Sequence, residues 1–131
     1  MPMIGWTLSA LVVVSLVAIG LGAVVAPRTA STQFGLAVDD PRALGLVRAM
    51  GMRDVVIGGL LGLVALAQAR HVLGWSMWVS ALIAVTDLAV VTADRRAAPT
   101  EGPPRPDAAR LLHASGAVGL ILTGTALLAG Y

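Results

Sequence analysis

The first apolar stretch of the chain, residues 4–25, runs for 22 residues without a charged side chain. A helix of that length rises about 33 Å, which is enough to cross a hydrocarbon core of roughly 30 Å. The composition agrees, because 57% of the 131 residues are hydrophobic and only 12% are charged, whereas soluble domains carry about 25% charged residues. The sequence therefore predicts one all-α integral membrane domain over residues 1–131.

Several other classes of protein fit the sequence poorly. A cleaved signal peptide would place positive charge before a shorter apolar stretch, and no charged residue precedes Trp6. The chain has no cysteine, which excludes disulfide and thiolate chemistry. Its net charge of +2 is too small to indicate a nucleic-acid partner.

Three further spans follow the first. Asp40 and Pro41 form a helix start, with an acidic N-cap before a proline at the first helical position. A tight turn at Arg70 and His71 then makes the second and third spans antiparallel neighbours. The proline-rich stretch 94–107 reads as a solvated loop. We expect a transmembrane four-helix bundle with spans at residues 4–25, 41–69, 72–93 and 108–130.

The basic residues predict the orientation of the bundle. All nine are arginines, and eight of the nine flank the first-to-second and third-to-fourth connections, whereas Arg70 alone lies on the opposite side. Cytoplasmic loops are enriched in arginine and lysine, so these two connections are expected in the cytoplasm and both termini outside. Trp6, Trp75, Trp78 and Tyr131 all fall at the outer helix ends, where interfacial aromatics gather. The expected location is the cell membrane, with multiple passes.

Three ionisable residues share one layer of the predicted bundle. Asp54 lies 15 residues from the outer end of the second span, Asp87 lies 15 from that of the third, and His113 lies 17 from that of the fourth. These separations correspond to depths of about 22–26 Å. An ionisable side chain inside a bilayer costs a few kcal/mol and is a functional-site hypothesis by default. We predict that Asp54, Asp87 and His113 form a catalytic set.

Two arginines of the second span complete the candidate site. Arg53 is adjacent to Asp54, and Arg48 lies five residues further towards the cytoplasm, so both are candidate ligands for an anionic oxygen of a substrate. Two structural alternatives stay open. Asp54 and Asp87 could be buried partners of Arg53 and His113 that fix helix register, and Arg48 could be an anchor that reaches the headgroups.

Metal and cofactor sites are not expected. Asp54, Asp87 and His113 are a conceivable ligand set, but such sets usually show closer spacing on a shared helix. The sequence also lacks a phosphate-binding glycine loop, a nucleophile elbow and an HExxH motif. Acid–base chemistry by side chains needs no cofactor.

A further pattern combines the segment 48–54, which reads Arg-x-x-Gly-x-Arg-Asp, with Pro27, Phe34-Gly35, Asp87 and His113. In these residues the chain resembles a group of small four-span membrane proteins of unassigned function from bacteria and fungi, similar in size and layout to the DoxX-like proteins. The resemblance covers most of the chain, and it implies no established catalytic residues. Genes of this type are sometimes associated with natural-product pathways, which implies an enzyme for a lipophilic intermediate.

The leading functional hypothesis is a membrane-embedded enzyme of the isomerase or cyclase type. Asp87 could orient His113 as an acid–base pair, and Asp54 could donate a proton to an apolar substrate during isomerisation, cyclisation or epoxide opening. A small proton-coupled transporter or channel is the first alternative, although the first span lacks the carboxylate that small multidrug exporters carry there. A structural or accessory subunit is the second. Small-residue helix faces also favour a homo-oligomer.

Overall fold

The computed structural model describes residues 3–33, 38, 40–97 and 108–131, and all five elements in these ranges are helices. Four of the helices are long and apolar enough to cross a membrane. The fifth, α2, is short and was not expected. The charged residues Arg105 and Asp107 of the predicted loop lie outside the described residues. The elements are α1 (Met3–Val25), α2 (Pro27–Gln33), α3 (Pro41–Leu66), α4 (Arg70–Ala97) and α5 (Ala108–Ala129).

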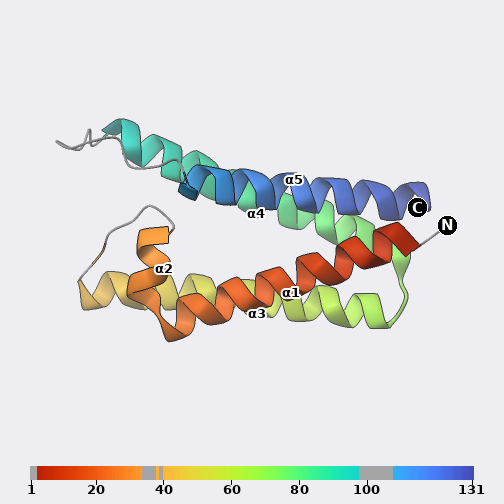
Figure 1. The fold of residues 1–131 in the computed structure, drawn as a ribbon, viewed down its shortest axis with the longest axis horizontal. Helices are drawn as coiled ribbons and strands as arrows, with labels where there is room; N and C mark the ends of the chain where they lie inside the picture. Colours follow the sequence, from red (N-terminus) through yellow and green to blue (C-terminus); the bar gives the residue numbers. More distant parts are fainter. Residues whose placement is uncertain (1–2, 34–37, 39, 98–107) are drawn as a thin grey trace.

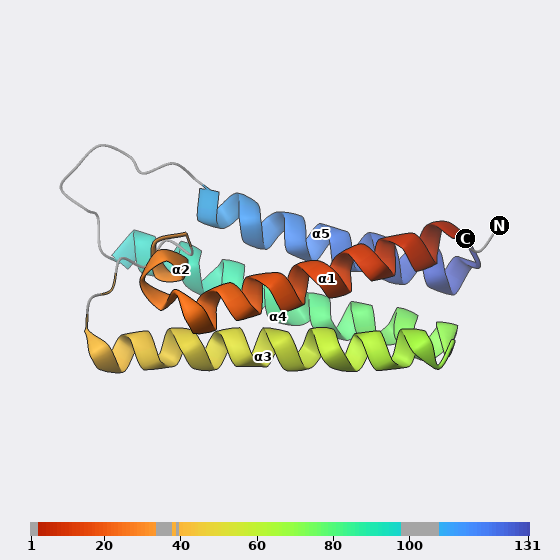
Figure 2. The same cartoon turned by 60° about the horizontal axis from the view of Figure 1, so that its bottom comes forward.

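The long helices are arranged as two antiparallel pairs. Figures 1 and 2 show α1 beside α3 and α4 beside α5, and these two contacts are far more extensive than those of α1 with α5 or α3 with α4. Because the four long helices alternate in direction along the chain, the two chain ends lie together (Figure 1). The backbone N–H of Gly5 donates there to the carbonyl of Tyr131 at 3.2 Å. The molecule is therefore two tight hairpins that meet along a looser seam.

Glycines set the close approach within each hairpin. A Cβ atom on Gly51 would lie 2.6 Å from the carbonyl oxygen of Gly20, and one on Gly124 would lie 2.8 Å from the carbonyl oxygen of Gly74. Side chains at these positions would force the helices apart. Small residues at helix contacts are typical of membrane proteins, where association depends on close packing rather than on hydrophobic burial. The glycine face of α3 thus packs against α1, as the contact of Gly58 with Val17 also shows.

The outward faces of the helices are apolar. Leu11, Leu60, Leu82 and Leu122, one from each long helix, are 57–66% exposed. A soluble protein would not leave such surfaces open, whereas a hydrocarbon solvent favours them. The buried core is small by comparison, and its residues are Leu61, Leu73, Met77, Ala81, Leu120 and Leu127.

The helix α2 folds back against the first hairpin. Pro27, Ala30 and Ser31 are its buried residues, and Ala30 packs with Ala23 of α1 and Val47 of α3. Seven residues rich in serine and threonine have little intrinsic helix propensity. The sequence pattern alone could not predict α2, because its stability comes from this packing.

The ends of the helices differ from expectation by more than one residue at three places. Asp40 caps α3 as predicted, and its carboxylate accepts a hydrogen bond from the backbone N–H of Ala43 at 3.0 Å. However, α3 ends at Leu66 rather than at residue 69, because Gln68 adopts a left-handed φ of 53°. The next helix starts at Arg70 rather than at residue 72, and it continues to Ala97 rather than to residue 93.

Candidate functional site

A cavity of about 180 Å³ lies between the two hairpins. Its walls come from all four long helices and are mostly apolar. We call it the central cavity. Four ionisable residues line it, namely Arg53, Asp54, Asp87 and His113, together with Ser80 and apolar residues that include Leu16, Ile19, Met50, Ile57, Leu112 and Leu120.

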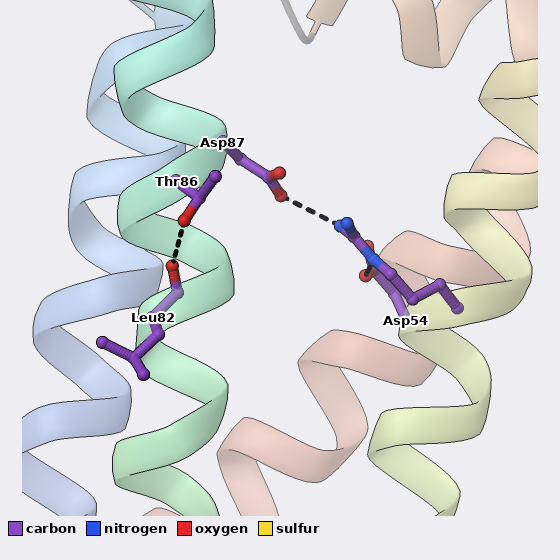
Figure 3. A network of polar contacts seen from close by, with 5 residues as sticks. Asp54, Leu82, Thr86 and Asp87 are labelled. Atoms are coloured by element: carbon purple, nitrogen blue, oxygen red, sulfur yellow. Dashed lines mark hydrogen bonds and ion pairs between the residues drawn. The ribbon is translucent and has the colours of Figure 1, made fainter.

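Arg53 connects the two carboxylates. Its Nη2 atom lies 2.9 Å from Oδ2 of Asp87, and its Nε atom lies 3.2 Å from Oδ1 of Asp54. Figure 3 shows Asp87 reaching from α4 towards α3, where Asp54 lies. The guanidinium group thus holds one oxygen of each carboxylate. The pair with Asp87 crosses the seam between the hairpins, whereas the pair with Asp54 lies within α3.

These charges are partly shielded from the surroundings. The side chains of Asp54 and Asp87 are 19% and 20% exposed, and that of Arg53 is 37% exposed. A net charge of one negative unit results from two carboxylates and one guanidinium. Such a cluster is tolerated in an apolar setting because each charge has a partner within hydrogen-bond distance.

His113 lines the same cavity from α5. One turn further along α5, Gly116 also lines it, and a Cβ atom added at Gly116 would have no other atom within 4 Å. The α5 wall is therefore open beside the imidazole. The arrangement places an imidazole, a guanidinium and two carboxylates around one small apolar space.

The structure separates Arg48 from the other candidate residues. Arg48 is exposed and lines a different hollow, together with Arg28, at the junction of α1, α2 and α3. Five residues at about 100° each turn Arg48 roughly 140° away from Arg53 around the helix, and about 7.5 Å along it. Arg48 is therefore not placed to bind the same substrate atom as Arg53.

The common layer is less level than the sequence suggested. Counted from the observed outer helix ends, Leu66, Arg70 and Ala129, the depths of Asp54, Asp87 and His113 become about 18, 26 and 24 Å. The long side chain of Arg53 spans this offset. The three residues still line one cavity.

The helix α1 contributes apolar side chains to the wall of the cavity. Leu16 and Ile19 line the cavity. Gly20 packs against Gly51, whereas a Cβ atom on Gly22 would meet nothing within 4 Å. Gly22 lines a second hollow that shares Ile19 and Leu112 with the central cavity. The spacing of apolar residues carries no signal for this neighbouring space.

The described residues include no group of three or more histidine, aspartate or glutamate side chains arranged to hold a metal ion. The cation between Asp54 and Asp87 is the guanidinium group of Arg53. This position is the one that a metal ion shared by the two carboxylates would need.

Comparison with known proteins yields one match. No curated protein and no solved structure matches the chain. One family matches residues 13–127, a range that begins in α1, ends in α5 and contains every residue of the central cavity. The chain therefore belongs to the family described as a domain of unknown function, DUF4267.

Proposed function

We propose that this protein is a membrane-embedded enzyme that moves protons on a lipophilic small molecule bound in the central cavity. The observation that carries the proposal is the meeting of Arg53, Asp54, Asp87 and His113 in one otherwise apolar cavity. If these charged residues only stabilised the fold, the ion pairs of Arg53 with the two carboxylates would be sufficient. An imidazole on the wall of the same cavity adds the side chain best suited to proton transfer near neutral pH.

The roles follow from the chemistry of each group. His113 removes a proton from the carbon that lies between the carbonyl group and the carbon–carbon double bond of a β,γ-unsaturated substrate. The electron pair of that C–H bond forms a new carbon–carbon double bond, and the π pair of the carbonyl group moves onto its oxygen. Arg53 holds the resulting oxyanion, and the two carboxylates hold Arg53 in place. The imidazolium, whose N–H proton exchanges with water, then donates a proton to the γ carbon. The carbonyl group re-forms at the same time, which gives the conjugated isomer without any co-reactant.

An apolar substrate would reach the cavity from the bilayer. The neighbouring hollow of about 390 Å³ is lined by small residues of α1, including Ala18, Gly22 and Ala23. It shares Ile19 and Leu112 with the central cavity. A movement of these two side chains would join the two spaces, so we place the entry route between α1 and α5.

We further propose that the chain lies in the cell membrane with both termini outside. The arginine distribution supports this orientation. The exposed aromatic residues also support it, because Trp75 and Trp78 lie in the first three turns of α4 and Tyr131 lies beside Gly5. A reporter that is active only in the cytoplasm, fused after Tyr131, should remain inactive. An active fusion would reverse the orientation. From the resemblance we also propose that the chain is related to the DoxX-like proteins and that its gene is associated with natural-product pathways.

The function can be tested without knowing the substrate. Lipophilic extract from source cells that lack this gene is incubated with the purified protein in D2O and analysed by mass spectrometry. Proton transfer through His113 should introduce deuterium at a non-exchangeable carbon of at least one compound. The labelled compound identifies the substrate.

The matched control uses the other histidine of the chain. His71 is exposed at the opposite end of the bundle, so His71→Gln should label the compound as the wild type does, whereas His113→Gln should abolish labelling. Wild-type protein that labels no compound, or labelling that persists in folded His113→Gln, contradicts the proposed function.

Proton-coupled transport is the second candidate, and the cross-seam ion pair favours it. A proton on Asp87 would release Arg53 and loosen the connection between the hairpins, as alternating access requires. Proteoliposomes that carry a pH-sensitive dye separate the two functions. Transport predicts substrate-dependent proton flux that Asp87→Asn abolishes, while the enzyme predicts labelled product with no flux.

A further inference from the structure

The hollow at the junction of α1, α2 and α3 has a volume of about 410 Å³. Two arginines from different helices line it, Arg28 of α2 and Arg48 of α3. The remaining walls are uncharged and include Pro27, Thr29 and Leu44. We call this hollow the arginine pocket.

The fold forms the arginine pocket by turning α2 back on the first hairpin. Pro27 and Ala30 are buried in this contact, which brings Arg28 to the side of α3 that carries Arg48. Neither arginine belongs to an ion pair within the described ranges. The nearby carboxylate of Asp40 is engaged in capping α3 through the N–H of Ala43. Among the residues that the structure describes, the walls of the pocket therefore carry two guanidinium groups and no carboxylate.

The depth of the pocket matches the headgroup region of a bilayer. Arg48 lies six residues before Asp54, which places it about 9 Å nearer to the first residue of α3. The neighbouring wall residues, Val25 and Pro41, are the last residue of α1 and the first of α3. Both α1 and α3 are long and apolar enough to cross a membrane, so their shared end lies where lipid phosphates gather.

We propose that Arg28 and Arg48 together bind a phosphate group, and that an anionic phospholipid headgroup supplies it. Guanidinium groups bind phosphate oxygens through paired, charge-assisted hydrogen bonds. Two such groups from two helices match one phosphate better than a single arginine that reaches the headgroups. This site is separate from the central cavity and does not depend on the proposed enzymatic function.

The experiment measures thermal unfolding of the purified full chain in detergent micelles with added phosphatidylglycerol, phosphatidylcholine or inorganic phosphate. Phosphatidylglycerol should raise the melting temperature of the wild type more than phosphatidylcholine does. In the double variant Arg28→Gln/Arg48→Gln, the apparent affinity for phosphatidylglycerol should fall about 10- to 100-fold, because hydrogen bonds to a charged group are lost.

Arg42→Gln is the matched control, since Arg42 is an exposed arginine of α3 outside the pocket wall. It should keep the wild-type response. A response that Arg42→Gln reduces as strongly as the double variant does, or equal shifts by both lipids, overturns the site. Inorganic phosphate that reproduces the full shift overturns the lipid source.

If the double variant fails to fold, a second measurement tests the same site. The milder variant Arg48→Lys keeps the charge but loses the fork of donors. Native mass spectrometry of this variant should show less retained phosphatidylglycerol than the wild type. Equal retention overturns the proposal.

Discussion

The Asp87→Asn substitution removes the charge from one end of the ion pair that joins α4 to α3. The nearest atoms of the pair are 2.9 Å apart. With an effective dielectric constant near 20, Coulomb's law gives a ceiling of about 6 kcal/mol for their attraction. The true loss is smaller, because the two side chains are 37% and 20% exposed and exposed pairs contribute only about 0–1 kcal/mol.

The second carboxylate reduces the cost further. Removing one partner of a buried pair costs about 3–5 kcal/mol when it leaves a charge without compensation. In this site Arg53 keeps Asp54 at 3.2 Å, and the asparagine keeps an oxygen that can accept a hydrogen bond. We therefore expect Asp87→Asn to lower the free energy of unfolding by about 1–2 kcal/mol.

A double-mutant cycle tests whether Arg53 is shared between the carboxylates. With Asp54→Asn and Asp87→Asn combined, Arg53 has neither carboxylate. The loss should therefore exceed the sum of the single losses by about 1 kcal/mol or more. The free energies can be measured by reversible unfolding of the purified protein in micelles with increasing dodecyl sulfate.

Thr86→Val is the matched control for stability. Thr86 precedes Asp87, and its hydroxyl group donates only to the carbonyl of Leu82 in its own helix, as Figure 3 shows. This variant should stay within about 0.5 kcal/mol of the wild type. An equal effect of Asp87→Asn and Thr86→Val, or an additive double variant, would refute the shared ion pair.

The same samples report on catalysis. If Asp87 holds Arg53 against the oxyanion during catalysis, the rate of deuterium labelling per folded molecule should fall by up to about 10²–10³-fold. A purely structural Asp87 predicts lower stability with normal labelling, and that result would remove Asp87 from the catalytic set.

Three further predictions concern space and backbone conformation. Gly51→Ala should destabilise the protein by about 1–3 kcal/mol, because its Cβ atom would lie 2.6 Å from the carbonyl oxygen of Gly20; unchanged unfolding would disprove the close contact. Gly116→Leu should fill the central cavity and abolish labelling without unfolding the protein. Gly59→Leu, which also places its side chain in open space, should keep the labelling. Equal labelling by the two variants would contradict the cavity as the site. Gln68→Gly should stabilise the protein by about 0.5–1 kcal/mol, because residue 68 has a φ of 53°, and a loss of stability in the same unfolding assay would count against this.

The long helices could be predicted from the sequence because their cause is local. A backbone in hydrocarbon must satisfy its own hydrogen bonds, so each long apolar stretch has to be helical. The capping of α3 by Asp40 is local as well. The short helix α2 was missed, since its stability depends on distant residues of α1 and α3.

The candidate site could be predicted in part. Ionisable residues are rare in apolar spans, which is why Asp54, Asp87 and His113 stood out, and all three line the central cavity. Arg48 was grouped with them on sequence proximity. The structure places it in a different pocket, because five residues along a helix turn the side chain away from Arg53.

The amino-acid sequence by itself determined which long segments are helical. It also determined which few positions within these apolar segments carry an ionisable side chain. Only the tertiary structure decided that α1 packs on α3, that Arg53 reaches across to Asp87 and that a cavity remains between the hairpins. The physical reason is that an apolar helix in an apolar solvent has no strongly preferred face. Its rotation and partner are set by a few close contacts, such as that of Gly20 with Gly51, and by one ion pair.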